Sequence, residues 1–209
     1  MAWREWIRTV EVVPALDAGD VAALQPAVDA LLRTGCRIFH VHVRGESDAD
    51  AITEMKIMAR RYDGVVDVHV RDADPAASFA RLAAAGADSV TFDAHAAADP
   101  ASTIRAAREC EVQVGVAFRV DIEPEEIAAT ASEADLVLCA CEGSHVVEHV
   151  RRVASLLPDR VEVQVEGGVS HDNLRSLSRA GARLLVADRP IFDREDLPRA
   201  YRRLVQALA

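Results

Sequence analysis

Short runs of β-branched residues alternate with longer segments rich in Ala and Leu along the whole chain, and this alternation constrains the fold more than any other feature. Such a pattern is typical of repeated βα units that build a parallel sheet. A glycine recurs where a helix-like segment gives way to the next apolar run, at Gly35, Gly86 and Gly181. The eight runs predicted as strands are residues 10–16, 37–43, 65–70, 89–92, 113–118, 136–140, 161–165 and 184–187.

Eight βα units predict an α/β fold, a single TIM (β/α)8 barrel over residues 1–209. Hydrophobic residues make up 50% of the chain, which is enough for one large core. The net charge of -10, with both signs interspersed, leaves no basic stripe for a nucleic acid. We find no apolar run long enough for a signal peptide or a membrane span, and therefore expect a soluble, cytoplasmic protein with no membrane partner.

Polar residues stand at the ends of three predicted strands: His40 and His42, His69, and Glu166. The carboxyl ends of parallel barrel strands meet at one mouth, and residues two apart on a strand share a face. Imidazole and carboxylate are common ligands of divalent first-row metals. A single histidine is more often a hydrogen-bonded or solvent-facing residue. The four together predict a site for one divalent ion, whether zinc, iron, manganese or cobalt.

Other charged residues follow the predicted strands, and each has two interpretations. Asp17 and Asp93, together with Glu46, are candidate acid/base groups, or else helix caps and solvated loop residues. Four arginines could ring the mouth and bind a carboxylate, phosphate or sulfonate of the substrate, or could be solvated loop residues. These arginines are Arg44, Arg71, Arg119 and Arg189. The four cysteines, Cys36, Cys110, Cys139 and Cys141, form no C-x-x-C pair and are interpreted as buried thiols.

Taken in order, the motifs His-Val-His at 40–42, Asp-Val-His at 67–69 and Glu-Gly-Gly-Val at 166–169 resemble those of the ribulose-phosphate 3-epimerase family. The resemblance covers nearly the whole chain. Members are TIM barrels that bind a divalent metal through two His and two Asp, and the two Asp also move the proton. The resemblance implies metal ligands at His40, His42, His69 and Glu166, and we expect Gly167 and Gly168 to contact the substrate.

Both family aspartates are replaced in this chain, by His42 and by Glu166. A carboxylate has spare lone pairs and can ligate an ion while accepting a proton, whereas a neutral imidazole has one free lone pair. If His42 is a ligand, Glu166 is left as the single base. Two-base chemistry then needs a second acid, for which Asp17 and Asp93 are candidates. Asp188 stands where the family has Gly-Ser, which weakens the expected phosphate pocket.

The leading functional hypothesis is a metal-dependent isomerase or epimerase of carbohydrate metabolism. It would transfer a proton through an enediolate on a small anionic ketose, such as a ketose phosphate, with Glu166 and His42 as catalytic residues. One alternative is a metal-dependent lyase or decarboxylase that acts on a small hydroxy or keto acid. Another is a catalytically silent barrel used for binding. Under the leading hypothesis we also expect a homo-oligomer.

Overall fold

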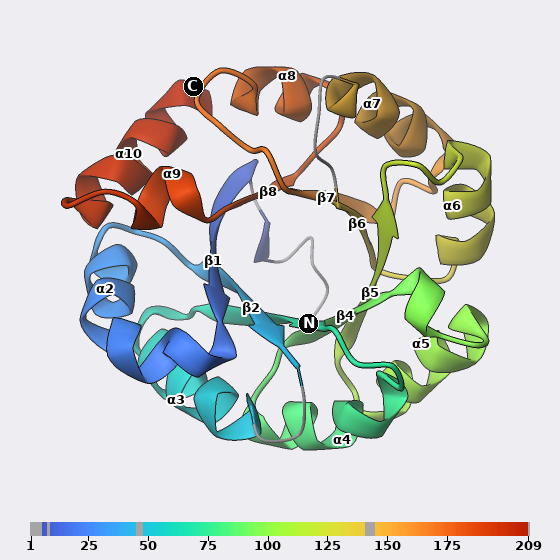
Figure 1. Ribbon diagram of the computed structural model, residues 1–209, viewed down its shortest axis with the longest axis horizontal. Coiled ribbons are helices and arrows are strands. Elements are labelled where there is room, and N and C mark those ends of the chain that lie inside the picture. Colours follow the sequence, from blue (N-terminus) through green and yellow to red (C-terminus); the bar gives the residue numbers. More distant parts are fainter. Residues whose placement is uncertain (1–5, 8, 45–47, 141–144, 209) are drawn as a thin grey trace.

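Eight parallel strands close into a barrel in which each strand pairs with its neighbours in the sequence and β8 pairs with β1 (Figure 1). The structure is a computed structural model that describes residues 6–7, 9–44, 48–140 and 145–208. Glu46 and Cys141 lie outside these residues. The strands are β1 (Glu11–Asp17), β2 (Ile38–Val43), β3 (Val65–Val70), β4 (Ser89–Asp93), β5 (Gln113–Arg119), β6 (Leu136–Ala140), β7 (Glu162–Glu166) and β8 (Leu184–Ala187).

Helices follow the strands and form a ring outside the barrel (Figure 1). This arrangement confirms the predicted TIM barrel, and every predicted strand agrees with an observed one to within one residue at each end. In the part of the chain that the structure describes, no helix is long and apolar enough to cross a membrane. The helices are α2 (Val21–Arg33), α3 (Ala49–Ala59), α4 (Ala76–Ala85), α5 (Pro100–Glu109), α6 (Pro124–Ala131), α7 (Val146–Leu156), α8 (Leu174–Arg179), α9 (Arg189–Phe192) and α10 (Leu197–Leu208), with short 3-10 turns at η1 (Ala18–Asp20), η3 (Arg60–Tyr62) and η4 (Ala94–Ala96).

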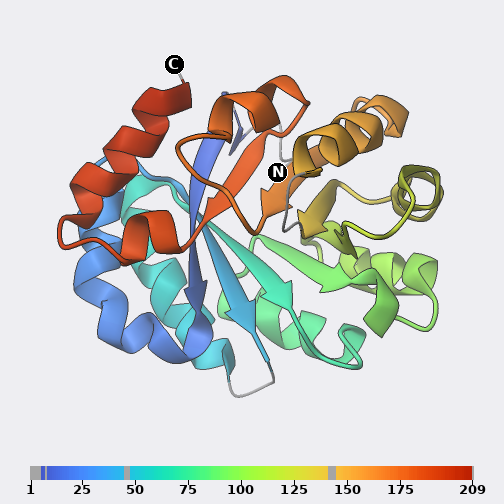
Figure 2. The same ribbon diagram turned by 45° about the horizontal axis from the view of Figure 1, so that its top comes forward.

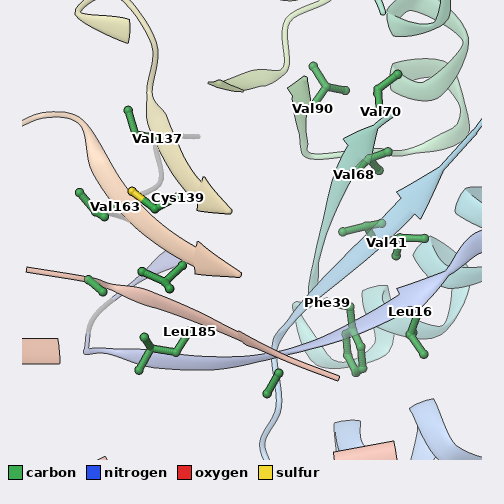
Figure 3. Packing of buried hydrophobic residues seen from close by; sticks show 14 of the residues in the cluster. Leu16, Phe39, Val41, Val68, Val70, Val90, Val137, Cys139, Val163 and Leu185 are labelled. Carbon is green, nitrogen blue, oxygen red and sulfur yellow. The ribbon is translucent and has the colours of Figure 1, made fainter. Parts of the chain in front are cut away.

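The strand alternation separates two buried regions. Outward-facing side chains such as Val41, Val68 and Val90 belong to the large core between strands and helices, part of which Figure 3 shows. Inward-facing apolar side chains form a second cluster inside the barrel. It includes Val13, Ile38, Val65, Leu136 and Leu184. Because side chains alternate with a period of two, β1, β2, β3, β5, β6 and β8 contribute to both regions, whereas the inward positions of β4 and β7 carry polar residues.

The register of the strands brings the polar residues to one end of the barrel. Neighbouring strands run in the same direction, as Figure 2 shows for β1, β2 and β3. In this register His42 lies opposite Asp17 on one side and opposite His69 on the other. One level lower, His40 lies opposite Asp67. Glu166 ends β7 at the same mouth, so residues far apart in the sequence become neighbours.

Candidate metal centre

Four potential ligands converge inside the mouth of the barrel, as the sequence predicts for a metal site. His40 and His42 come from β2, His69 from β3 and Glu166 from the end of β7. Each offers one ligand atom, and these four atoms all lie within 4.8 Å of one another. The three imidazole rings are packed together, with centroids 5.0 to 5.6 Å apart. The strands therefore bring this set together without help from a loop.

His40 is held from below by a buried carboxylate. Its Nδ1 lies 2.7 Å from Oδ2 of Asp67, and neither side chain is exposed to solvent. The other ring nitrogen, Nε2, is buried and has no hydrogen-bond partner. If Nδ1–H donates to Asp67, the lone pair of Nε2 points into the cluster unused. A buried polar atom without a partner is costly in free energy, so this atom fits the role of a metal ligand.

Asp67 itself is anchored by two side chains from other strands. Ser89 Oγ donates to Oδ1 of Asp67, and Gln164 Nε2 donates to Oδ2 at 3.0 Å. Burial opposes ionisation of Asp67, but its contacts with His40, Ser89 and Gln164 outweigh this effect and lower the pKa of the carboxyl group. The ring of His40 therefore rests on an ionised and fully hydrogen-bonded support.

His69 has the same kind of arrangement with its nitrogens exchanged. Its Nε2 lies 3.1 Å from Oδ1 of Asp93, and its buried Nδ1 has no hydrogen-bond partner and lies 3.6 Å from Oε2 of Glu166. Burial disfavours the charged imidazole, but the contacts with Asp93 and Glu166 prevail and raise the pKa of His69. The pKa of Asp93 is lowered, despite its burial, by the same contact. His69 thus fits the site through Nδ1.

His42 is surrounded by three charged groups. Its Nε2 lies 2.6 Å from Oε1 of Glu166 and 3.0 Å from Nη2 of Arg71, while its Nδ1 lies 3.7 Å from Oδ1 of Asp17. Because Nε2 carries either a hydrogen or a lone pair, it can donate to Glu166 or accept from Arg71 but cannot do both. Coordination of a cation by Nε2 and Glu166 would remove this conflict. Burial lowers the pKa of His42, although Glu166 opposes the shift.

Glu166 is the carboxylate at the centre of the site. One oxygen lies 2.6 Å from His42 Nε2, and the other lies 3.6 Å from His69 Nδ1. Burial opposes its ionisation, but the contacts with the two imidazoles hold the pKa of Glu166 well below its usual range. The carboxylate is therefore ionised at neutral pH, which is the form that both a metal ligand and a proton acceptor require.

A pocket of about 540 Å³ opens beside Glu166 and His42. Gly167 and Gly168 line this pocket. Both have a positive φ, 85° and 65°, which residues other than glycine rarely adopt. The lining also includes Asp188 and Arg189, which follow β8. Burial, together with the nearby Asp193, raises the pKa of Asp188. The pocket thus combines two residues of the ligand cluster, His42 and Glu166, with a second carboxylate that follows β8.

The four candidate arginines occupy different environments. Arg71 reaches the cluster, where its Nη2 lies 3.4 Å from Oε1 of Glu166, and Arg189 lines the pocket. Arg119 instead forms an ion pair with Asp121 at 3.1 Å, and its side chain is 70% exposed. The side chain of Arg44 is also exposed, while its backbone N–H donates to a neighbouring aspartate. The structure therefore brings two of the four arginines to the site.

Sequence reasoning missed the support beneath the ligands. Asp67 and Gln164 stand two residues before His69 and Glu166, so they share the inward phase of those ligands, and Ser89 faces the same interior from β4. The signal was present in the strand period, because a polar residue two positions before a ligand must face the barrel interior. A polar side chain there needs partners of its own.

Sequence comparison finds relatives over nearly the whole chain. The sequence model of the "Ribulose-phosphate 3 epimerase family" matches residues 11–192. The chain is 24% identical to the ribulose-phosphate 3-epimerase of Chlamydia muridarum, with 90% of each chain covered. It is 27% identical to that of Schizosaccharomyces pombe, with 87% of this chain and 86% of the relative covered.

Solved structures show the same fold at lower identity. An orotidine 5'-phosphate decarboxylase from Pyrococcus horikoshii OT3 superposes with a TM-score of 0.76 at 15% identity, covering 95% of this chain and 99% of that one. A 3-hexulose-6-phosphate synthase superposes with a TM-score of 0.72 at 22% identity, covering 95% and 100%. At this identity the structural likeness concerns the barrel fold alone.

Proposed function

The chain belongs to the ribulose-phosphate 3-epimerase family, and from this membership and the geometry of its mouth we propose that it is a metal-dependent isomerase of the epimerase type. It would move a proton at the carbon next to the carbonyl of a small anionic ketose. The observation that carries the proposal is the pair of buried, unpartnered nitrogens, His40 Nε2 and His69 Nδ1, within one cluster of ligand atoms.

The donor set fits a single divalent ion. His40 would bind through Nε2 and His69 through Nδ1, and His42 and Glu166 would complete the set. A bound ion would supply Lewis-acid stabilisation of the negative charge that develops on the substrate oxygens. Three imidazoles and one carboxylate are compatible with zinc, iron, manganese or cobalt.

Glu166 is the proposed base. Its carboxylate lies on the wall of the pocket, and it has two oxygens, so it can remain in the donor set while accepting a proton from the substrate carbon. Its low pKa keeps it ionised at neutral pH, although the same low pKa makes it a weak base in isolation. The substrate proton must therefore be acidified by the charged surroundings of the site.

A second proton carrier decides between isomerisation and epimerisation. His42 holds its position in the donor set through Nε2, so that atom is not free to carry the proton. Asp17 lies 3.7 Å from His42 Nδ1, and its side chain is 54% exposed at the mouth. We assign Asp17 as the second acid/base group in an epimerase. Without its participation, Glu166 alone would support one-base chemistry of the aldose–ketose type.

The charged residues around the pocket support an anionic substrate that is held by only a few positive groups. Arg71 lies against Glu166 and His42, and Arg189 lines the pocket together with Gly167 and Gly168. We propose that these residues contact the substrate. Asp188 stands in the same lining and would repel a phosphate placed beside it. This carboxylate favours a second candidate, a lyase or decarboxylase acting on a small hydroxy or keto acid without phosphate.

The test uses metal-loaded protein with ribulose 5-phosphate in deuterated water. We expect a deuterium label at the carbon next to the carbonyl together with epimerised product, both followed by NMR. Label without an epimer would indicate one-base chemistry. Absence of both label and product would reject the epimerase, and cleavage products from hydroxy or keto acids would then support the second candidate.

A further inference from the structure

Each histidine of the cluster has one ring nitrogen that points away from the cluster, and this nitrogen faces a carboxylate. Each of these carboxylates comes from a strand next to that of its histidine. His40 Nδ1 lies 2.7 Å from Asp67, His69 Nε2 lies 3.1 Å from Asp93, and His42 Nδ1 lies 3.7 Å from Asp17. The three pairs are not equivalent. The first two are within hydrogen-bond distance, and the third is not.

From this geometry we propose that Asp93 is a positioning residue, which accepts the Nε2–H of His69 and thereby presents Nδ1 of that ring to the metal. This inference rests on the proposed metal-dependent function. It assigns to Asp93 a task different from that of a second acid or base. Asp93 lies on the side of the ring opposite Glu166, since His69 contacts the two carboxylates through different nitrogens.

The physical reason lies in the tautomers of imidazole. A neutral ring carries one N–H and one lone pair, and a carboxylate that accepts from one nitrogen fixes the lone pair on the other. The ring of His69 is 2% exposed, so no bulk water competes for the N–H at its position. Without Asp93 the hydrogen could move to Nδ1, and the lone pair needed for the metal would be lost. Loss of such a support typically weakens metal binding about 10- to 100-fold.

Asp93 is placed for this task by its strand. It ends β4, two residues after Thr91, which lies opposite His69 in the register, and its own side chain is 24% exposed. Asp17 provides the contrast, because its contact is longer and its side chain is 54% exposed. A carboxylate at that distance does not fix a tautomer. We therefore expect Asp93 and Asp17 to differ in what their removal does.

The experiment compares Asp93→Asn with Asp17→Asn and with the control Asp121→Asn. Asp121 also follows a strand and has a lowered pKa, but its partner is Arg119 and not the cluster. The dissociation constant for zinc is measured by competition with a chromophoric chelator. The tautomer of His69 is read from the nitrogen chemical shifts of ¹⁵N-histidine-labelled protein without metal, above the imidazole pKa. Deuterium exchange of ribulose 5-phosphate is measured at saturating metal.

We expect Asp93→Asn to weaken zinc binding about 10- to 100-fold and to reduce the population of the Nε2–H tautomer of His69. We expect exchange at saturating metal to change by a small factor, and Asp17→Asn and Asp121→Asn to leave zinc binding nearly unchanged. Unchanged zinc binding and an unchanged tautomer in Asp93→Asn would overturn the proposal. If exchange were also lost in that variant at saturating metal, Asp93 would be an acid/base group instead.

The tautomer measurement separates this inference from the proposed function. If wild-type protein bound no stoichiometric zinc, the metal-dependent function would fail. The nitrogen shifts of the metal-free protein would still show whether Asp93 holds the hydrogen on Nε2. Should Asp93→Asn fold poorly, Asp93→Glu provides a second variant, and we expect it to keep the tautomer with zinc binding between those of wild type and Asp93→Asn.

Discussion

The two ends of the barrel interior are built from opposite kinds of side chain. Where the strands begin, the inward positions carry Ile38, Val65, Leu136 and Leu184, which pack into an apolar cluster. Where β2, β3 and β7 end, the inward positions carry three imidazoles and a carboxylate. The apolar end gains free energy on burial. The polar end leaves two buried nitrogens without partners, which is the cost expected if its arrangement serves a ligand, as we propose.

The largest effect is expected from Glu166→Gln at the polar end. The amide keeps the shape of the side chain but cannot accept a proton, so we expect deuterium exchange at saturating metal to fall roughly 10²- to 10⁴-fold. Glu162→Gln is the matched control, because Glu162 begins the same strand at the opposite end of the barrel. Exchange that survives in Glu166→Gln at the wild-type rate would show that another group is the base.

At the apolar end, Leu136→Ala should reduce stability and leave the chemistry intact. Leu136 is fully buried in the inner cluster, so its truncation leaves a cavity and should lower the free energy of unfolding by about 2 to 5 kcal/mol. Urea unfolding measures this loss, and zinc binding at low temperature should remain near the wild-type value. A large loss of zinc affinity in the folded variant would mean that the two ends are not independent.

Arg71→Gln should change metal binding and substrate binding in opposite directions. Arg71 places a positive charge beside Glu166 and His42, so its removal should tighten zinc binding by about tenfold or less, since the guanidinium is partly exposed and screened. The same change should raise the KM for an anionic substrate. The control is Arg119→Gln, whose guanidinium pairs with Asp121. Weaker zinc binding in Arg71→Gln would contradict the placement of this charge.

A pH dependence of stability is expected at Cys36, which lies in the core between strands and helices just before β2 begins. Burial raises the pKa of the Cys36 thiol from its ordinary value of 9.0 to about 12. Below pH 9 the thiol is neutral in both states and its contribution to stability is fully present. As the pH rises toward 12, the unfolded thiol ionises first and stability falls, by at most about 1.4 kcal/mol per pH unit.

Urea unfolding between pH 8 and pH 11 measures this slope, and Cys36→Ala should make it shallower. Cys110→Ala, at a half-buried position, is the control and should leave the slope unchanged. An identical slope in wild type and Cys36→Ala would assign the alkaline loss of stability to other groups.

The sequence predicts the strands and the ligand cluster because both depend on a period of two. A β-branched run defines a strand, and a histidine at its end faces inward or outward according to that period, so His40, His42 and His69 could be assigned to one mouth. The ion-pair partner of a side chain at a strand end could not be predicted in the same way. Arg119 pairs with Asp121, two positions along the chain, although its position at the end of a strand would equally allow it to face the mouth.

The support beneath the ligands shows the same limit. Asp67, Ser89 and Gln164 lie on three strands, and their mutual hydrogen bonds depend on the stagger of the closed barrel. The sequence shows three polar residues in apolar runs without showing that they meet. Asp93 is a similar case, since a carboxylate at a strand end reads equally well as a helix cap, an acid or a support for a neighbouring histidine. The contact of 3.1 Å between Asp93 Oδ1 and His69 Nε2 is visible only in the fold, and it favours the third interpretation.

The central claim is that the cluster at the barrel mouth binds one divalent metal ion. Its most direct test is the zinc stoichiometry of the purified protein after loading and removal of excess metal. Elemental analysis of wild type, His69→Ala and the exposed-histidine control His95→Ala provides the comparison. We expect one zinc ion per chain in wild type and His95→Ala, and a large loss in His69→Ala. Equal zinc content in all three proteins, or no stoichiometric zinc in wild type under any loading condition, would contradict the account.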